Sequence, residues 1–390
     1  METLVNVVFM GKFGYPSGMA ATKRIQHFLD YLNGESVGTR VLLLSQRGGA
    51  VSRDPAEGTY KGTEYKKLRY DIRLNSYTFH TLLKYFTTGI STLESWRVRG
   101  AKNILYCYGG LTLENIVFVL VGKIFGYRVL LDIVEDSTFI EEKLHVAAKV
   151  KWLASEILDR FSFKIADGLV VISSYLRELY ANRRDASVPI CLIPISAKCH
   201  DHPGKTKERG PLKIVYAGSF AKKDGLELLI EAFEKIDKEA GECVLMLSGT
   251  GANVKVYEPR IAANPAIRYL GYLDDAEFDQ FLQQADVLCV TRTGSVYANA
   301  GFPFKLGEYL ATGNPVIVSD VGDVRTYLED MVDAIIVEPD NVAAITGALE
   351  YCIRNPEATA RIGRNGEVKC REHFDPLVNG RKLLELIHSL

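Results

Sequence analysis

The sequence lacks an excess of charge of either sign, because 47 lysines and arginines stand against 48 aspartates and glutamates and leave a formal net charge of −1. A protein that coats nucleic acid or an anionic membrane over its whole surface needs a strong positive field. The balance therefore excludes that class of protein. Nucleic acid is not an expected partner, and only a local basic patch stays open.

Cysteine pairs with the spacing of redox or zinc motifs are also missing. The seven cysteines are odd in number, no two form a CxxC pair, and five lie in apolar runs such as ECVLML and ADVLCV. We interpret them as small buried side chains of a protein from a reducing compartment. Cys191, Cys199, His200 and His202 are irregularly spaced, and there is no HExxH or DxD-type cluster at a strand end, so no metal site is predicted.

Long hydrophobic runs are absent as well. Only Met-Glu-Thr precedes the first apolar run, and small and polar residues follow it, which is not the order of a signal peptide. The most apolar stretch, residues 115–134, contains Lys123 and Arg128 with Gly126 between two shorter runs. It is predicted to be a helix followed by a strand rather than a membrane span. A cytoplasmic location is expected.

Short apolar runs alternate with helix-length amphipathic segments through most of the 390 residues. This length exceeds the roughly 250–300 residues at which one core stops growing, so two domains are expected. Fully apolar runs such as YRVLLDIV suit parallel sheets covered by helices. The prediction is an α/β fold of two consecutive domains with a cleft between them. Their bounds are 1–198, a polar linker at 199–211, 212–374, and an amphipathic helix at 375–390 that packs elsewhere or wraps back.

Ligands of such domains sit beyond the carboxyl ends of the strands, where three glycine-bearing turns are candidate binding loops. The first includes Gly14 and is either a loop that approaches a ligand closely or a plain strand-to-helix turn, with neither favoured. In the second, a lysine pair forms either a diphosphate clamp or a solvated surface pair. The third can approach a base through backbone groups. The candidates in the last two turns are Gly218, Ser219, Lys222, Lys223, Gly249, Tyr272 and Leu273.

A fourth turn, residues 299–315, carries the most information. Pro303 fits the first position of a helix that stops near Gly313. Lys305 and Glu308 are three residues apart and lie on one helix face, where a cation in the first turn opposes the helix dipole. An anionic ligand would account for this arrangement, with Lys305 meeting phosphate and Glu308 accepting from hydroxyls. An ordinary ion pair between the two is an equal alternative.

With these residues, the chain resembles the retaining glycosyltransferases of family 4, which have the GT-B fold. The resemblance rests on YPSGMAATKRI, ADGLVVISSYLRELY, KIVYAGSF with KDGLELLIEAF, IRYLGYLDDAEFDQFLQQADV and GFPFKLGEYLATGNPVIVSD, in this order. It implies two Rossmann-like domains, a nucleotide sugar bound mainly by the second, and a last helix that crosses back to the first. The nucleotide sugar is a substrate, and no cofactor or metal is implied.

The resemblance also implies roles for single residues. Glu308 matches the second glutamate of the family's E-x7-E motif, which bonds the ribose. Tyr272 and Leu273 match the segment that holds the base, and Gly14 lies in the loop that faces the phosphates. The residues implied to face the diphosphate and the sugar are Lys305 and the amides near Gly301 and Phe302.

Two departures from the family pattern stand out. The first glutamate of E-x7-E is replaced by Ala300, so either Asn299 substitutes for it or the backbone alone holds the sugar. The family's arginine and lysine after the first strand of the second domain fall at Ser219 and Asp224, which leaves Lys222 and Lys223 as shifted replacements. Retaining transfer needs stabilisation of the departing diphosphate, which Lys305 and Lys223 can supply without a metal.

An acidic strand end in the first domain, LLDIVEDSTF, is the candidate acceptor site. Either Glu135 or Asp136 accepts or orients the acceptor hydroxyl, as in similar enzymes, or each is an ordinary helix N-terminal acid. With Lys305 they are the candidate catalytic residues.

Charge is divided unevenly, because residues 1–200 carry +7 (26 basic, 19 acidic) and residues 201–390 carry −8 (21 basic, 29 acidic). Similar enzymes often dock on the inner membrane leaflet through such a basic face. A solvated basic loop at 40–73 that binds no membrane is an equal alternative.

The expected function is transfer of a sugar from a UDP- or GDP-sugar to a glycan or lipid-linked acceptor in polysaccharide or glycoconjugate synthesis. A nucleotide-sugar epimerase and a non-catalytic nucleotide-sugar-binding partner are the alternatives.

Overall fold

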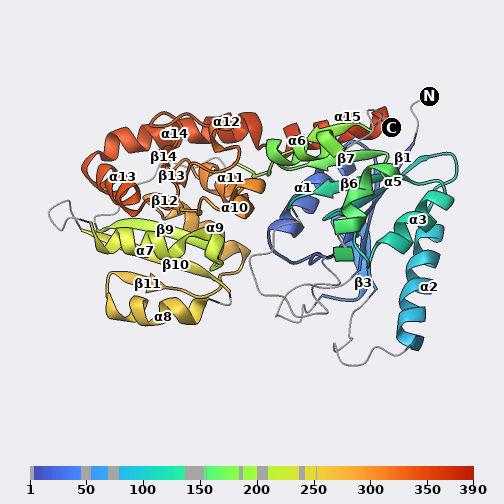
Figure 1. Cartoon of the computed structure of the whole chain (residues 1–390), viewed down its shortest axis with the longest axis horizontal. Helices are drawn as coiled ribbons and strands as arrows, with labels where there is room; N and C mark the ends of the chain where they lie inside the picture. The colour runs from blue at the N-terminus through green and yellow to red at the C-terminus, as the bar shows by residue number, and fades with distance from the viewer. Residues whose placement is uncertain are drawn as a thin grey trace. The chain divides into compact units, whose positions relative to one another are not determined.

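A computed structural model describes residues 4–44, 54–68, 79–136, 153–154, 156–183, 188–199, 210–236, 242–251 and 253–390. The chain divides into two compact units (Figure 1). The first unit contains Met1–Pro194 and Pro376–Leu390, and the second contains Ile195–Asp375. His200 and His202, and the basic residues Arg47, Arg53, Arg69 and Arg73, lie outside the described residues.

The described part of the first unit contains one sheet with the strand order β3-β4-β2-β1-β5-β6-β7-β8. Neighbouring strands pair in parallel except β3 and β4, which form an antiparallel hairpin at one edge. The central strand β1 is buried along its whole length. The strands are β1 (Val5–Gly11), β2 (Gly38–Leu43), β3 (Glu57–Tyr60), β4 (Thr63–Lys67), β5 (Lys102–Tyr108), β6 (Arg128–Ile133), β7 (Gly168–Val171) and β8 (Ile190–Leu192).

Helices of the first unit connect its strands, and the last helix of the chain joins them. Helix α15 (Pro376–Ser389) packs against α1, where Gly380 faces the ring of Tyr31 and has no room for a side chain. Leu383 and Ile387 are fully buried there, whereas Leu377 is exposed. Figure 1 shows α15, in red, among the blue and green elements of this unit. The other helices are α1 (Ala20–Gly34), α2 (Phe79–Trp96), α3 (Ile116–Ile124), α5 (Ser162–Ile165) and α6 (Ser174–Arg183).

The second unit contains a parallel sheet with the order β11-β10-β9-β12-β13-β14 among its described residues. The order reverses at β9, which lies between β10 and β12, and such a switch point is where open α/β sheets bind ligands. The strands are β9 (Leu212–Ser219), β10 (Cys243–Thr250), β11 (Ile267–Tyr269), β12 (Val287–Val290), β13 (Val316–Ser319) and β14 (Ile335–Val337). The helices are η1 (Lys222–Asp224), α7 (Leu226–Glu234), α8 (Val254–Ala263), α9 (Asp275–Gln283), α10 (Val296–Ala300), α11 (Phe304–Leu310), α12 (Val324–Tyr327), α13 (Val342–Arg354) and α14 (Pro356–His373).

The apolar stretch at 115–134 forms helix α3 and strand β6, as its sequence predicts. Within the described ranges, no helix is long and apolar enough to cross a membrane. The units divide between Pro194 and Ile195, upstream of the polar segment at 199–211, because Ile195 and Ala197 are buried against Gly307 of the second unit. The hairpin β3–β4 and the short strand β8 have no counterpart in the sequence prediction.

Candidate functional site

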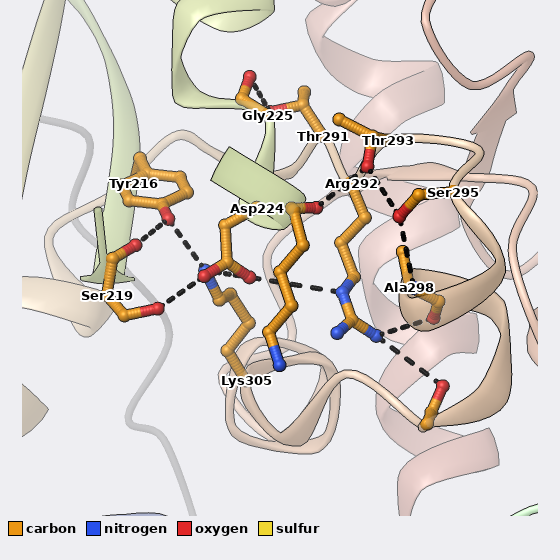
Figure 2. A network of polar contacts seen from close by, with 12 residues as sticks. Tyr216, Ser219, Asp224, Gly225, Thr291, Arg292, Thr293, Ser295, Ala298 and Lys305 are labelled. Atoms are coloured by element: carbon orange, nitrogen blue, oxygen red, sulfur yellow. Dashed lines mark hydrogen bonds and ion pairs between the residues drawn. The ribbon is translucent and has the colours of Figure 1, made fainter. Parts of the chain in front are cut away.

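A cluster of charged side chains occupies the carboxyl ends of β9 and β12 in the second unit. Asp224 of η1 lies between Lys305 of α11 and Arg292, which follows β12, and Tyr216 of β9 borders the cluster (Figure 2). All four side chains are largely removed from water. The turn at residues 299–315 therefore lies beside the switch point of the sheet.

Lys305 reaches back from α11 to the end of β9. Its Nζ donates to the Tyr216 hydroxyl at 3.0 Å, lies 4.1 Å from the centre of the Tyr216 ring, and is 3.7 Å from Oδ1 of Asp224. Burial lowers the pKa of Lys305 from 10.5 to about 8, because Asp224 only partly offsets the loss of hydration and the cation of Arg292 adds to the lowering. Lys305 is therefore positively charged at neutral pH, and Asp224 and the Tyr216 hydroxyl are the polar groups that its ammonium contacts.

Asp224 has polar neighbours on both sides of the cluster. The Ser219 hydroxyl donates to its Oδ2, and Arg292 Nε lies 3.9 Å from its Oδ1. Burial alone would raise the pKa of Asp224, but Lys305, Ser219, Arg292 and Lys223 together hold it below its ordinary value. The carboxylate is therefore ionised and bridges two cations.

Arg292 was not among the residues predicted from the sequence. Its Nη1 donates to the carbonyl oxygen of Ala298 at 3.1 Å and lies 3.5 Å from that of Gly301, so its guanidinium holds the turn that joins α10 to α11. A signal was present, because Arg292 directly follows the buried residues 287–291 and strand ends of a parallel sheet gather at one edge. Tyr216 was also missed, since it lies within an apolar strand.

Glycine is required where β9 and β10 end side by side. Gly249 has φ +140°, and a Cβ there would lie 1.8 Å from the carbonyl oxygen of Gly218. A Cβ on Gly218 itself, with φ +150°, would lie 2.7 Å from Lys305 Nζ. The two predicted glycines therefore let the strands and the lysine approach each other closely.

The other predicted residues of the second unit surround this cluster or lie farther along the sheet edge. Lys222 is exposed and Lys223 half-buried, both on η1, and Glu308 is half-buried one turn after Lys305. Tyr272 is 62% exposed, beside the half-buried Leu273.

The segment before α11 is tied to the body of the unit. The Asn299 amide donates to the carbonyls of Gly294 and Ser295 and accepts from the Gly322 amide, so it fixes the local turn. Ala300 is 1% exposed, and Phe302 packs its ring on Tyr327 and Phe374. Pro303 is the residue before the first turn of α11 rather than its first residue, because the helix begins at Phe304.

In the first unit, the turn around Gly14 is closed by its own atoms. The Gly14 carbonyl accepts from Thr22 Oγ1 at 2.7 Å, and a Cβ on Gly14 would lie 2.4 Å from the carbonyl oxygen of Ser17. This compact turn leads into α1, which begins at Ala20.

The three acidic residues at the end of β6 in the first unit differ in burial and in their partners. Asp132 is fully buried in an ion pair with Arg24, so it is not accessible to a substrate. Asp136 is buried and accepts from the Tyr175 hydroxyl at 3.2 Å, whereas Glu135 is exposed.

Two Rossmann-like units, the second with a charged cluster at its switch point, define a GT-B fold, and solved structures agree. Sucrose-phosphate synthase from Thermosynechococcus elongatus superposes with a TM-score of 0.79 at 15% identity, over 99% of this chain and 98% of that one. HepE from Anabaena, solved in complex with UDP, gives a TM-score of 0.68 at 15% identity over 99% of this chain and all of its own.

Sequence comparison identifies the second unit more closely. Residues 200–369 match the family model of the glycosyl transferases group 1. A phosphatidyl-myo-inositol mannosyltransferase of Mycobacterium leprae is 27% identical over 36% of this chain. That match spans only 37% of the relative's own length. An uncharacterized glycosyltransferase of Methanocaldococcus jannaschii is 20% identical over 66% of this chain and 67% of its own length.

Proposed function

We propose that this protein is a glycosyltransferase that moves a sugar from a nucleoside-diphosphate sugar, UDP- or GDP-linked, to a glycan or lipid-linked acceptor with retention at the anomeric carbon. The reaction needs no metal or cofactor in this proposal and serves polysaccharide or glycoconjugate synthesis. The ammonium group of Lys305 at the strand switch point is the observation that carries it.

Lys305 is suited to hold a diphosphate leaving group. When the glycosidic bond to the donor breaks, negative charge develops on the departing diphosphate, and a cation already in place stabilises that charge without reorganisation. Because burial removes water from Lys305, its attraction for a phosphate is stronger than that of an exposed lysine. Lys223, which is half-buried on η1, adds a second positive charge.

The remaining donor contacts follow the resemblance to family 4. Glu308 accepts from the ribose hydroxyls, the backbone of Tyr272 and Leu273 holds the base, and the amides near Gly301 and Phe302 face the sugar. Ala300 offers a methyl group where the family has a carboxylate, so backbone groups hold the sugar in this proposal.

In the first unit, we assign the acceptor hydroxyl to Asp136 rather than Glu135. Asp136 is buried and held by Tyr175, which keeps its carboxylate in one position, as a group that orients a hydroxyl must be. Glu135 is exposed to solvent. The Gly14 turn faces the phosphates in this proposal.

The acceptor class is suggested by relatives whose names include a phosphatidyl-myo-inositol mannosyltransferase and a lipopolysaccharide outer core galactosyltransferase. A lipid-linked acceptor would place the protein at the cytoplasmic face of a membrane, with the basic first unit against anionic lipid. Four of the cations in the segment 40–73 already pair with carboxylates, which reduces their field: Arg40, Lys61, Lys66 and Lys67. Flotation with anionic vesicles at low and high salt tests the membrane contact.

The test of the donor site is a thermal-shift screen with UDP-, GDP- and ADP-sugars, followed by transfer assays with the donor that stabilises most. Lys305→Met is expected to abolish transfer and retain the fold, because a neutral side chain cannot stabilise the diphosphate. Lys255→Met, on the exposed face of α8, is the matched control and should turn over like the wild type.

Other outcomes would contradict the proposal. Wild-type turnover by the Lys305→Met variant would remove Lys305 from the donor site. An epimerised sugar formed from donor alone would indicate a nucleotide-sugar epimerase, and donor binding without hydrolysis or transfer across a broad acceptor panel would indicate a binding partner. NMR of the product's anomeric proton tests retention, and assays with EDTA test metal independence.

A further inference from the structure

We propose that Arg292 and Asp224 are positioning residues of the donor site: Asp224 holds the ammonium of Lys305 at the end of β9, and Arg292 anchors Asp224 and the turn into α11. This inference rests on the proposed function, because it assigns these residues to the binding of a donor diphosphate. Neither residue needs to touch the donor.

The first observation is that this chain has an acid where the family has a base. The resemblance to family 4 places a lysine at the position of Asp224. In this chain the nearby cation comes from another element, because Lys305 of α11 lies 3.7 Å from Asp224. An acid close to a diphosphate would repel it unless cations outweighed the acid. Asp224 has two cations within 4 Å, Lys305 and Arg292, and it also accepts from Ser219 (Figure 2). The group as a whole keeps a positive charge.

The second observation is that Arg292 contacts two separate segments of the second unit. Its Nε faces Asp224 while its Nη1 contacts the carbonyl oxygens of Ala298 and Gly301, so one planar group joins η1 to the turn between α10 and α11 (Figure 2). The side chain is 6% exposed, and a buried guanidinium with several acceptors has one preferred orientation. The amides next to Gly301 are those that the proposed function directs at the donor, so Arg292 sets their position.

The third observation is the set of ionisable groups that face Lys305. They are Tyr216 on β9, Asp224 on η1, Arg292 after β12, and Glu308 on its own helix; Lys223 acts on Asp224. Arg292 lowers the pKa of Lys305 and Asp224 raises it. Removing Arg292 should therefore keep Lys305 protonated to higher pH, and removing Asp224 should neutralise it at lower pH.

The test measures binding of UDP, GDP and ADP by titration calorimetry between pH 6 and 9.5, using the nucleotide that the wild type binds best. Affinity of the wild type is expected to fall as pH rises through about 8 and Lys305 loses its proton. Arg292→Gln should bind about tenfold more weakly at pH 7 and lose affinity at a higher pH than the wild type. Arg292→Lys should keep the wild-type pH midpoint, since it retains the charge, but recover only part of the affinity. Asp224→Asn should lose affinity at a lower pH. Arg325→Gln, an exposed cation of the same unit, is the control and should match the wild type in both respects.

The results separate the two proposals. If the wild type binds none of the three nucleotides, the proposed function is wrong. If the wild type binds one of them and the Arg292→Gln and Asp224→Asn variants match its affinity and pH midpoint, this inference is overturned and the proposed function stands. If Arg292→Gln does not fold, as judged by circular dichroism, the shifted midpoint of Asp224→Asn and the weakened binding of Arg292→Lys decide the question.

Discussion

Replacing Arg24 with methionine is predicted to destabilise the first unit strongly. Arg24 lies on α1 and forms a two-pronged ion pair with Asp132 of β6, with Nε–Oδ2 at 2.9 Å and Nη2–Oδ1 at 3.0 Å. Its side chain is 1% exposed and that of Asp132 is 0% exposed. The guanidinium also donates to the carbonyl oxygens of Ile193 and Pro194, at 3.1 and 2.7 Å. Methionine fills similar space but leaves a buried carboxylate and two carbonyls without this donor.

The expected magnitude follows from that loss. Removing one partner of a buried ion pair costs about 3–5 kcal/mol, because the remaining charge is left in a medium of low polarity. In a unit of this size, each kcal/mol lowers the unfolding midpoint by about 2–4 °C, so the expected fall is about 6–20 °C. Because Pro194 is the last residue of the first unit before the chain enters the second, the same change loosens that crossing segment.

Urea unfolding followed by circular dichroism and tryptophan fluorescence measures the change. The control is Arg128→Met, because Arg128 pairs with Asp167 at 3.2 Å but is 56% exposed, and its loss should cost less than about 1 kcal/mol. The double variant Arg24→Met with Asp132→Leu should recover most of the lost stability, since no buried charge remains. A single variant Arg24→Met within about 1 kcal/mol of the wild type would refute the reasoning.

Three further predictions concern the second unit. Asp274→Ala removes the capping box of α9 that Asp274 forms with Glu277 and should cost about 1 kcal/mol in urea unfolding; no loss would mean that the cap is not formed in solution. Gly249→Ala should destabilise by more than about 1 kcal/mol because of its positive φ and its contact with Gly218, whereas Gly347→Ala, in open space on α13, should stabilise; equal effects would contradict the close approach of β9 and β10. Because the pKa of Lys305 is about 8 when folded and 10.5 otherwise, the unfolded chain binds more protons between these values, so the unfolding free energy should rise with pH there. A Lys305→Met variant should lack that rise, and identical pH profiles of the two proteins would show that folding does not lower the pKa of Lys305.

Most of the elements that position the site follow from hydrophobic pattern. Fully apolar runs such as residues 104–107 and 287–290 became central parallel strands, and the GT-B fold is confirmed by the structural comparison. The hairpin β3–β4 was missed because its strands carry charged and small residues and β3 is largely exposed, so it lacks the alternation that marks a half-buried strand. Its position depends on the pairing of β4 with β2.

The sequence alone determined the candidate loops, because glycine, proline and charged residues at strand ends have local conformational causes. It placed Lys305 and Glu308 on one helix and Gly218 and Gly249 at strand ends. It could not determine which charges meet, since Asp224, Arg292 and Lys305 lie on three elements up to 81 residues apart (305 − 224) that only the strand order β10-β9-β12 brings together. Lys305 lies 3.7 Å from Asp224 in the tertiary structure, a partner that the sequence did not predict. Arg292 is buried between Asp224 and the carbonyl oxygen of Ala298, and only the fold brings these groups together.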